Sequence, residues 1–165
     1  MSLAGLVQKI SLDAKTAARQ VAILPTDIKN KALAAIAAGL QRQRPLIEQE
    51  NQKDIAAAQK QGYPTAFIDR LTLSEKVINS MVQGLDEVIH LPDPVGAVTS
   101  MWKRPNGLLV GRQRIPLGVI GFIYESRPNV TVDAAALCLK SGNAVILKGG
   151  KEAIHSNLVL SNIMA

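Results

Sequence analysis

Apolar residues in the first ninety positions recur at the three- and four-residue spacing of amphipathic helices. Four helices are therefore predicted in a helical region over residues 1–92. Ser2 is expected to cap the first helix and Thr26 the second; the third begins at Pro45, and the capping box Thr72-Leu73-Ser74-Glu75 opens the fourth. Pro25 ends the first helix, Gly62 ends the third, and Pro92 lies beyond the fourth.

The pattern changes to strands after two closely spaced prolines between Leu91 and Gly96. Two runs with strand character, residues 98–104 and 108–115, flank Pro105-Asn106-Gly107. Because Asn-Gly readily takes the positive dihedral angles of a tight turn, residues 97–115 are predicted to form a β-hairpin.

A strand-helix-strand-helix unit is predicted over residues 117–165. Apolar runs at 117–124 and 144–148 suit strands buried on both faces, and helix formers fill residues 130–140 and 153–164. Two such strands joined by a helix lie parallel with a right-handed crossover, so both end at the edge where open sheets hold ligands. The fold class is α/β, with the first half of a Rossmann-like parallel sheet, and further strands are expected from a longer protein.

Composition describes a globular chain of 165 residues with a formal net charge of +6. Its basic residues are scattered and its aromatic residues are few, so mild attraction for anionic ligands is expected, without nucleic-acid binding. The single cysteine excludes an internal disulfide and fits a reducing compartment. With no membrane-length apolar run and no signal-peptide pattern, a cytoplasmic location is expected.

Lysine and glycine follow the second strand directly. The stem of Lys148 can pack on the strand while its ammonium reaches the sheet edge, where it suits a phosphate or ribose; a solvated boundary lysine is the equally open alternative. Gly149 and Gly150 would let a ligand approach the backbone. Neither a Walker loop nor a G-x-G-x-x-G fingerprint occurs.

The polar cluster from Glu125 to Asn129 follows the first strand. Asn129 is either a helix N-cap or an amide donor to a developing oxyanion. Glu125 and Arg127 can pair with each other. Cys138 stands among alanines and leucines in the predicted helix with no histidine placed to activate it, so it is interpreted as a core residue. His90 and His155 are isolated, and no metal-ligand spacing is present.

Three segments together resemble gamma-glutamyl phosphate reductase (glutamate-5-semialdehyde dehydrogenase), a family of the aldehyde dehydrogenase superfamily. They are Arg114-Ile-Pro-Leu-Gly-Val-Ile-Gly121, Tyr124-Glu-Ser-Arg-Pro-Asn-Val-Thr131 and Lys140-Ser-Gly-Asn-Ala-Val-Ile-Leu-Lys-Gly-Gly150. Ala17-Ala18-Arg19 and Asn51-x-x-Asp54 in the helical region fit as well, so the resemblance covers essentially the whole chain.

The resemblance implies NADPH-dependent reduction of L-glutamate 5-phosphate to L-glutamate 5-semialdehyde with release of phosphate, a step of proline biosynthesis. In that chemistry a cysteine thiolate attacks the acyl phosphate and the nicotinamide supplies hydride. The family's nucleophilic cysteine lies further along the chain than the Lys-Gly-Gly segment. The resemblance therefore implies a partial NADP-binding domain over residues 1–165, with the catalytic domain absent and no activity on its own.

The resemblance also assigns roles to individual residues. Lys148 matches a lysine that contacts the adenosine ribose, and Lys151 would favour a 2′-phosphate and hence NADP(H). Asn129 matches the oxyanion-hole asparagine, with Arg127 as the competing alignment. The remaining assignments are Gly149, Gly150 and Glu125 to the cofactor, and Ser126 and Arg127 to the substrate, glutamyl phosphate.

Three hypotheses follow for the chain. The first is a truncated reductase. The second is a noncatalytic nucleotide-binding or assembly module. It is favoured by the helices and by the hairpin, which by the resemblance corresponds to the oligomerisation strands of aldehyde dehydrogenases. Because a half-sheet exposes an apolar edge strand, a homo-oligomer is also expected. The third, nucleic-acid binding, depends on charge alone.

Overall fold

The computed structural model describes residues 2–165. Its N-terminal region contains five helices: α1 (Leu3–Val21), α2 (Thr26–Arg42), α3 (Arg44–Lys60), α4 (Thr65–Leu71) and α5 (Glu75–His90). The first helix is capped as predicted, since the backbone N–H of Gly5 donates to the Ser2 hydroxyl at 3.2 Å. Helix α4 was not predicted.

Two predicted helix caps were wrong. Pro25 occupies the N-cap position of α2, and the Thr26 hydroxyl donates instead to Asp93 Oδ2 at 2.9 Å. At α5, the N-cap is Ser74, whose hydroxyl accepts from the N–H of Val77 at 3.4 Å. The hydroxyl of Thr72 donates back to a carbonyl of α4 at 2.7 Å, so it is not available to cap α5.

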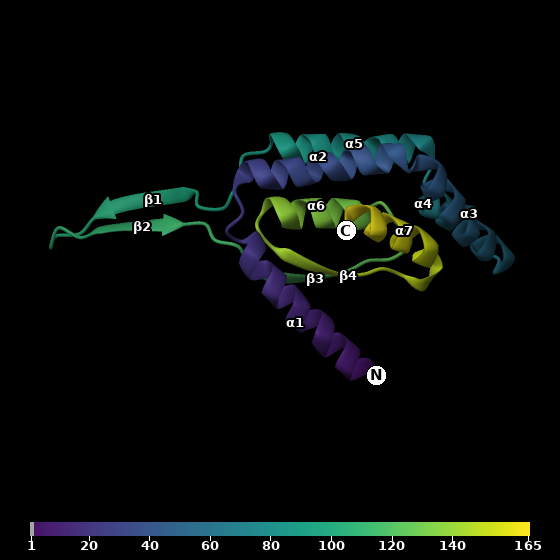
Figure 1. Ribbon diagram of the computed structural model, residues 1–165, viewed down its shortest axis with the longest axis horizontal. Coiled ribbons are helices and arrows are strands. Elements are labelled where there is room, and N and C mark those ends of the chain that lie inside the picture. Colours follow the sequence, from purple (N-terminus) through teal and green to yellow (C-terminus); the bar gives the residue numbers. More distant parts are fainter. Residues whose placement is uncertain (1) are drawn as a thin grey trace.

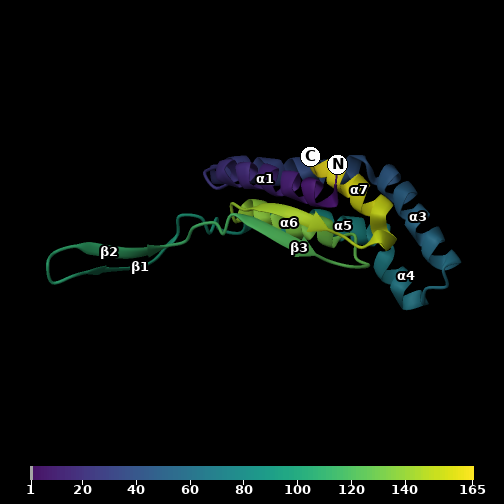
Figure 2. The same cartoon turned by 90° about the horizontal axis from the view of Figure 1, so that it is seen from below.

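The hairpin forms where it was predicted, from β1 (Val98–Lys103) and β2 (Leu109–Gln113) in antiparallel pairing. Gly107 has a φ of +88°, and the N–H of Leu108 donates to Asn106 Oδ1 at 3.2 Å, which closes the turn. The hairpin extends away from the helices as an arm (Figures 1 and 2). None of its strand residues is buried.

The parallel unit is also confirmed. Strands β3 (Val119–Ile123) and β4 (Ala144–Lys148) pair in parallel, with Ile123 opposite Lys148. Helix α6 (Val130–Lys140) connects them, and a short 3₁₀ turn, η1 (Lys151–Ala153), leads into α7 (Ile154–Met164). Both strands therefore end at the same edge of the sheet, as their spacing predicted.

The elements form layers. Helices α2 and α5 lie side by side, α6 lies between them and the sheet, and α1 covers the opposite face of the sheet (Figure 1). Helix α7 packs beside α6 and against α3.

The hydrophobic core lies among the helices. Its fully buried members include Leu33, Leu40, Ile47, Ile78 and Leu160. The prediction that both strands are buried on both faces was wrong, because no residue of β3 is buried and Ile123 is 77% exposed. Helices α1 and α6 pack mainly against β4 and leave β3 open.

Two buried lysines join helices to one another and to the segment that precedes the hairpin. Lys29 of α2 is completely buried, and its ammonium lies 2.8 Å from Asp93, in the segment between α5 and β1. The same carboxylate accepts from the N–H of Val95 at 2.9 Å. Lys140 of α6 donates to Asn30 Oδ1 at 2.7 Å and to the carbonyl of Ile89 at 2.8 Å.

Candidate functional site

The loops after β3 and β4 are joined directly to each other. The N–H of Tyr124 donates to the carbonyl of Lys148 at 3.1 Å, which continues the ladder one residue beyond the strands. Ser126 has a φ of +49°, in the left-handed region that is unfavourable for a non-glycine residue. Its N–H donates to Glu152 Oε1 at 2.8 Å, so Glu152 holds this turn in place.

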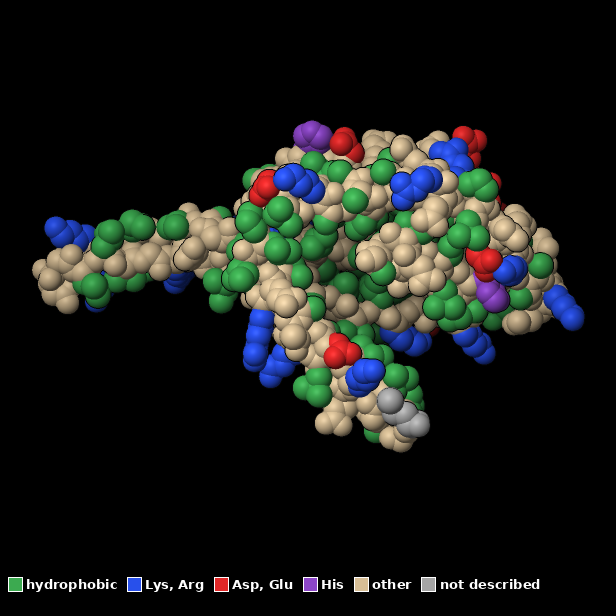
Figure 3. Space-filling view, viewed as in Figure 1, with side chains coloured by type: hydrophobic (Ala, Val, Ile, Leu, Met, Phe, Trp, Pro, Cys, Tyr) green, Lys and Arg blue, Asp and Glu red, His purple; other side chains and the backbone are tan. Residues whose placement is uncertain are grey.

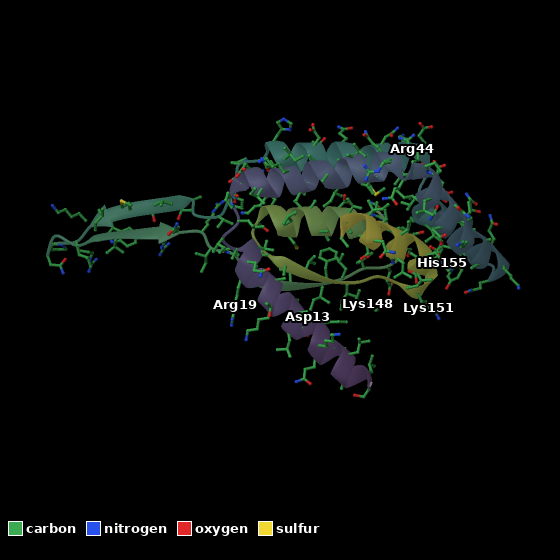
Figure 4. All side chains as sticks on the ribbon, viewed as in Figure 1. Asp13, Arg19, Arg44, Lys148, Lys151 and His155 are labelled. Carbon is green, nitrogen blue, oxygen red and sulfur yellow. The ribbon has the colours of Figure 1, made fainter. Side chains whose placement is uncertain are left out.

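Lys148 lies at the rim of a cavity of about 300 Å³ between the end of the sheet and α7. One wall is a chain of polar groups: the Tyr124 hydroxyl and Thr131 Oγ1 are 2.5 Å apart, and Thr131 donates to Asn157 Oδ1 at 3.1 Å. The Lys148 side chain is exposed, near the end of β4 (Figure 4). A cation next to hydroxyl and amide groups suits a phosphorylated sugar.

Gly149 and Gly150 lie close to the ends of neighbouring side chains. A Cβ at Gly149 would lie 2.2 Å from Asn157 Nδ2, and one at Gly150 would lie 2.0 Å from Glu152 Oε1. The space over the two glycines therefore already holds side chains of η1 and α7. Their role toward a ligand stays a prediction.

Asn129 and Arg127 line a different cavity, of about 330 Å³, among α4, α5 and the start of α6. Asn129 makes no capping bond; its Nδ2 donates to Asp133 Oδ2 at 3.2 Å. Burial raises the pKa of Asp133, and the hydrogen bond from Asn129 offsets this in part. Because α6 begins between the two strand ends, Asn129 and Lys148 lie at separate cavities.

Three other predicted site residues lie outside these two cavities. Lys151 lines a third cavity, of about 210 Å³, with His155 and Tyr63. Glu125 is exposed, and Ser126 is partly buried with its N–H bound to Glu152.

The Asn51-x-x-Asp54 pattern forms a buried brace that sequence reasoning did not identify as structural. Asp54 accepts from the N–H of Ser156 at 2.8 Å, from its hydroxyl at 2.6 Å and from the N–H of His155 at 3.2 Å. Asn51 binds the same serine hydroxyl at 2.9 Å and the carbonyl of Leu71 at 2.8 Å. The Asp54 carboxylate also interacts favourably with the N-terminal end of the α7 dipole. The brace therefore holds the start of α7, which forms one side of the Lys148 cavity.

Cys138 lies in α6 and is buried, as predicted. Burial raises the pKa of its thiol, which disfavours the thiolate required of a nucleophile. Among residues 2–165, no group of three or more His, Cys, Asp or Glu side chains is arranged to hold a metal ion.

Lys and Arg side chains are spread over the visible face of the molecule and over the arm, without a continuous basic stripe (Figure 3). Across the described part of the chain, each helix is too short or too polar to cross a bilayer.

Comparison with known proteins gives consistent matches, although no protein-family profile matches the chain. Gamma-glutamyl phosphate reductase of Desulforapulum autotrophicum is 57% identical over 164 residues, which is 99% of this chain and 39% of that relative. The solved structure of the Thermotoga maritima enzyme of the same name is 41% identical over 92% of this chain and 36% of its own, with a TM-score of 0.89.

The chain matches part of gamma-glutamyl phosphate reductases along nearly its whole length. The enzyme of that name from Saccharomyces cerevisiae agrees, at 33% identity over 99% of this chain and 41% of its own, with a TM-score of 0.92. Aldehyde dehydrogenases at 16–20% identity share the fold alone, with TM-scores of 0.65 to 0.70. This confirms the expected α/β fold and the expected resemblance, and the chain spans about 39% of the length of the curated relatives.

Proposed function

We propose that this chain forms part of an enzyme that reduces L-glutamate 5-phosphate to L-glutamate 5-semialdehyde in proline biosynthesis. The observation that carries the proposal is 57% identity, over 99% of the chain, to a gamma-glutamyl phosphate reductase. The reaction converts the acyl phosphate, NADPH and a proton into the aldehyde, NADP⁺ and inorganic phosphate.

The residues at the end of β4 fit a nicotinamide dinucleotide. Lys148 offers an exposed ammonium at a cavity of about 300 Å³, a size within the range of small-molecule sites. The partly buried Tyr124 hydroxyl, which is held by Thr131, can exchange a hydrogen bond with ribose. Lys151, three residues after Lys148, lines a separate cavity that shares Ile154 with the first, and it would favour the 2′-phosphate of NADP(H). The bound cofactor would supply the hydride.

The nucleophilic thiol is proposed to lie outside residues 1–165. Cys138 is the single cysteine of the chain, and its burial in α6 disfavours ionisation. The 165-residue chain alone is therefore expected to release no phosphate from glutamyl phosphate.

The proposal is tested in a chimera in which this chain replaces the matching segment of the Desulforapulum autotrophicum reductase. The chimera should release phosphate from glutamyl phosphate only when NADPH is present. A folded chimera without this activity would show that the proposed function is wrong.

Lys148→Ala in the chimera should raise the KM for NADPH about tenfold or more, because a charged hydrogen bond to the cofactor is lost. The KM for glutamyl phosphate should not change. Lys15→Ala, an exposed lysine of α1, is the matched control and should alter neither constant. Equal increases in both KM values for Lys148→Ala would show that Lys148 does not bind the cofactor.

A further inference from the structure

The cavity beside Asn129 has walls of distinct chemistry. Of the nine residues that line it, only Val77 and Met81 of α5 are apolar. Helix α4 contributes Asp69 and Arg70, and the loop before α6 contributes Arg127. The cavity thus combines both signs of charge with a short apolar strip.

The charged groups of α4 have no partner within the described chain. Among residues 2–165, neither Asp69 nor Arg70 forms an ion pair, and the same holds for Arg127. Arg44, labelled in Figure 4, shows the contrast, because its guanidinium lies 2.7 Å from Glu75 and also donates to Asn79. Arginine and aspartate that face a cavity without such partners are available to a ligand.

A free amino acid carries the matching groups. Its α-carboxylate suits the two-pronged donor geometry of a guanidinium, and its α-ammonium suits a carboxylate. The methylene groups of a glutamyl chain can pack on Val77 and Met81. Asn129 lines the same cavity, and its Nδ2 donates to Asp133 Oδ2 at 3.2 Å.

We propose that Arg70 and Asp69 bind the α-carboxylate and the α-ammonium of the glutamyl substrate, with its acyl phosphate end toward Asn129 and Arg127. This assignment depends on the proposed function for its substrate. It makes α4 the element that selects an amino-acid aldehyde over a simple aldehyde.

The test uses the chimera in the direction of aldehyde oxidation, with phosphate and NADP⁺. Three aldehydes are compared: L-glutamate 5-semialdehyde, 4-aminobutanal, which lacks the α-carboxylate, and 5-oxopentanoate, which lacks the α-ammonium. Each kcat/KM is divided by that of the unsubstituted chimera on the same aldehyde, so differences in aldehyde cyclisation cancel.

Arg70→Ala should lower kcat/KM for L-glutamate 5-semialdehyde about tenfold to a hundredfold and leave 4-aminobutanal unchanged. Asp69→Asn should lower it for the natural aldehyde and leave 5-oxopentanoate unchanged. Arg70→Lys should recover part of the loss, since it restores the charge but not the paired donors. Asp13→Asn and Arg19→Ala on exposed faces of α1 are the matched controls (Figure 4).

A uniform loss on all three aldehydes for Arg70→Ala, or no loss, would overturn the assignment. An inactive unsubstituted chimera would instead refute the proposed function. Calorimetric titration of L-glutamate into that chimera would still decide the role of Arg70: its Kd should rise about tenfold or more in Arg70→Ala. An unchanged Kd would refute it.

Discussion

Removal of the Asp54 carboxylate should strongly destabilise the protein, because it leaves buried donors without acceptors. Asp54 is 2% exposed and Ser156 is completely buried. In Asp54→Ala, the N–H and the hydroxyl of Ser156 lose their acceptor, as does the N–H of His155.

The size of the effect follows from these three bonds. A buried donor left unsatisfied costs about 1–3 kcal/mol, and loss of a helix-capping side chain costs about 0.5–2 kcal/mol. Since these terms overlap, Asp54→Ala should lower the free energy of unfolding by about 3–5 kcal/mol. That is a large share of the roughly 5–15 kcal/mol typical of a domain.

The assay is urea unfolding followed by far-ultraviolet circular dichroism. Asp54→Ala should shift the midpoint to lower urea with an unchanged slope. Asp54→Asn should lower the free energy of unfolding less than Asp54→Ala does, because the amide oxygen can still accept one of these hydrogen bonds. Asp13→Ala, an exposed change on α1, should leave the midpoint in place. A midpoint for Asp54→Ala equal to that of Asp13→Ala would refute the reasoning.

Two further predictions concern Asp93 and Asn129. Desolvation raises the pKa of Asp93, but hydrogen bonds from Lys29, the Val95 N–H and Thr26 together lower it below 3.8. Its contribution to stability is therefore complete above that value and is lost as the pH falls through the lowered pKa. Asp93→Asn should destabilise the protein at pH 7 and progressively less as the pH falls below 3.8, and an equal loss of stability at every pH would contradict this. Asn129→Ala in the chimera should lower kcat about ten- to a thousandfold if its amide stabilises an oxyanion, whereas an unchanged kcat with a lower Tm would make it structural.

Most of the fold could be predicted from local patterns. The prediction of the hairpin depended on Asn106-Gly107, and the prediction of the parallel unit depended on two short apolar runs; both are local signals. Helix α4 was missed because it has only seven residues, too few for a helical period to show. The exposure of β3 was missed because an apolar run does not reveal which elements cover it.

The candidate site could be predicted only in part. The sequence identified the two strand ends, but it could not show that α6 separates Lys148 from Asn129. Asp69 and Arg70 carry no local signal, since they reach the Asn129 cavity only through the packing of α4 on distant elements. The glycines after Lys148 were predicted to let a ligand approach the backbone, whereas the side chains nearest to them are those of Asn157 and Glu152.

The brace at Asp54 has a consequence for how the protein is made. Its bonds to Ser156 join residues 102 positions apart, and the bond from Lys140 to Asn30 spans 110 positions. While the ribosome is still adding residues, the early helices lack the partners that cover their apolar faces. A chaperone that shields nascent chains should therefore remain on this region until α7 has emerged, and release should coincide with burial of the Asp54 carboxylate.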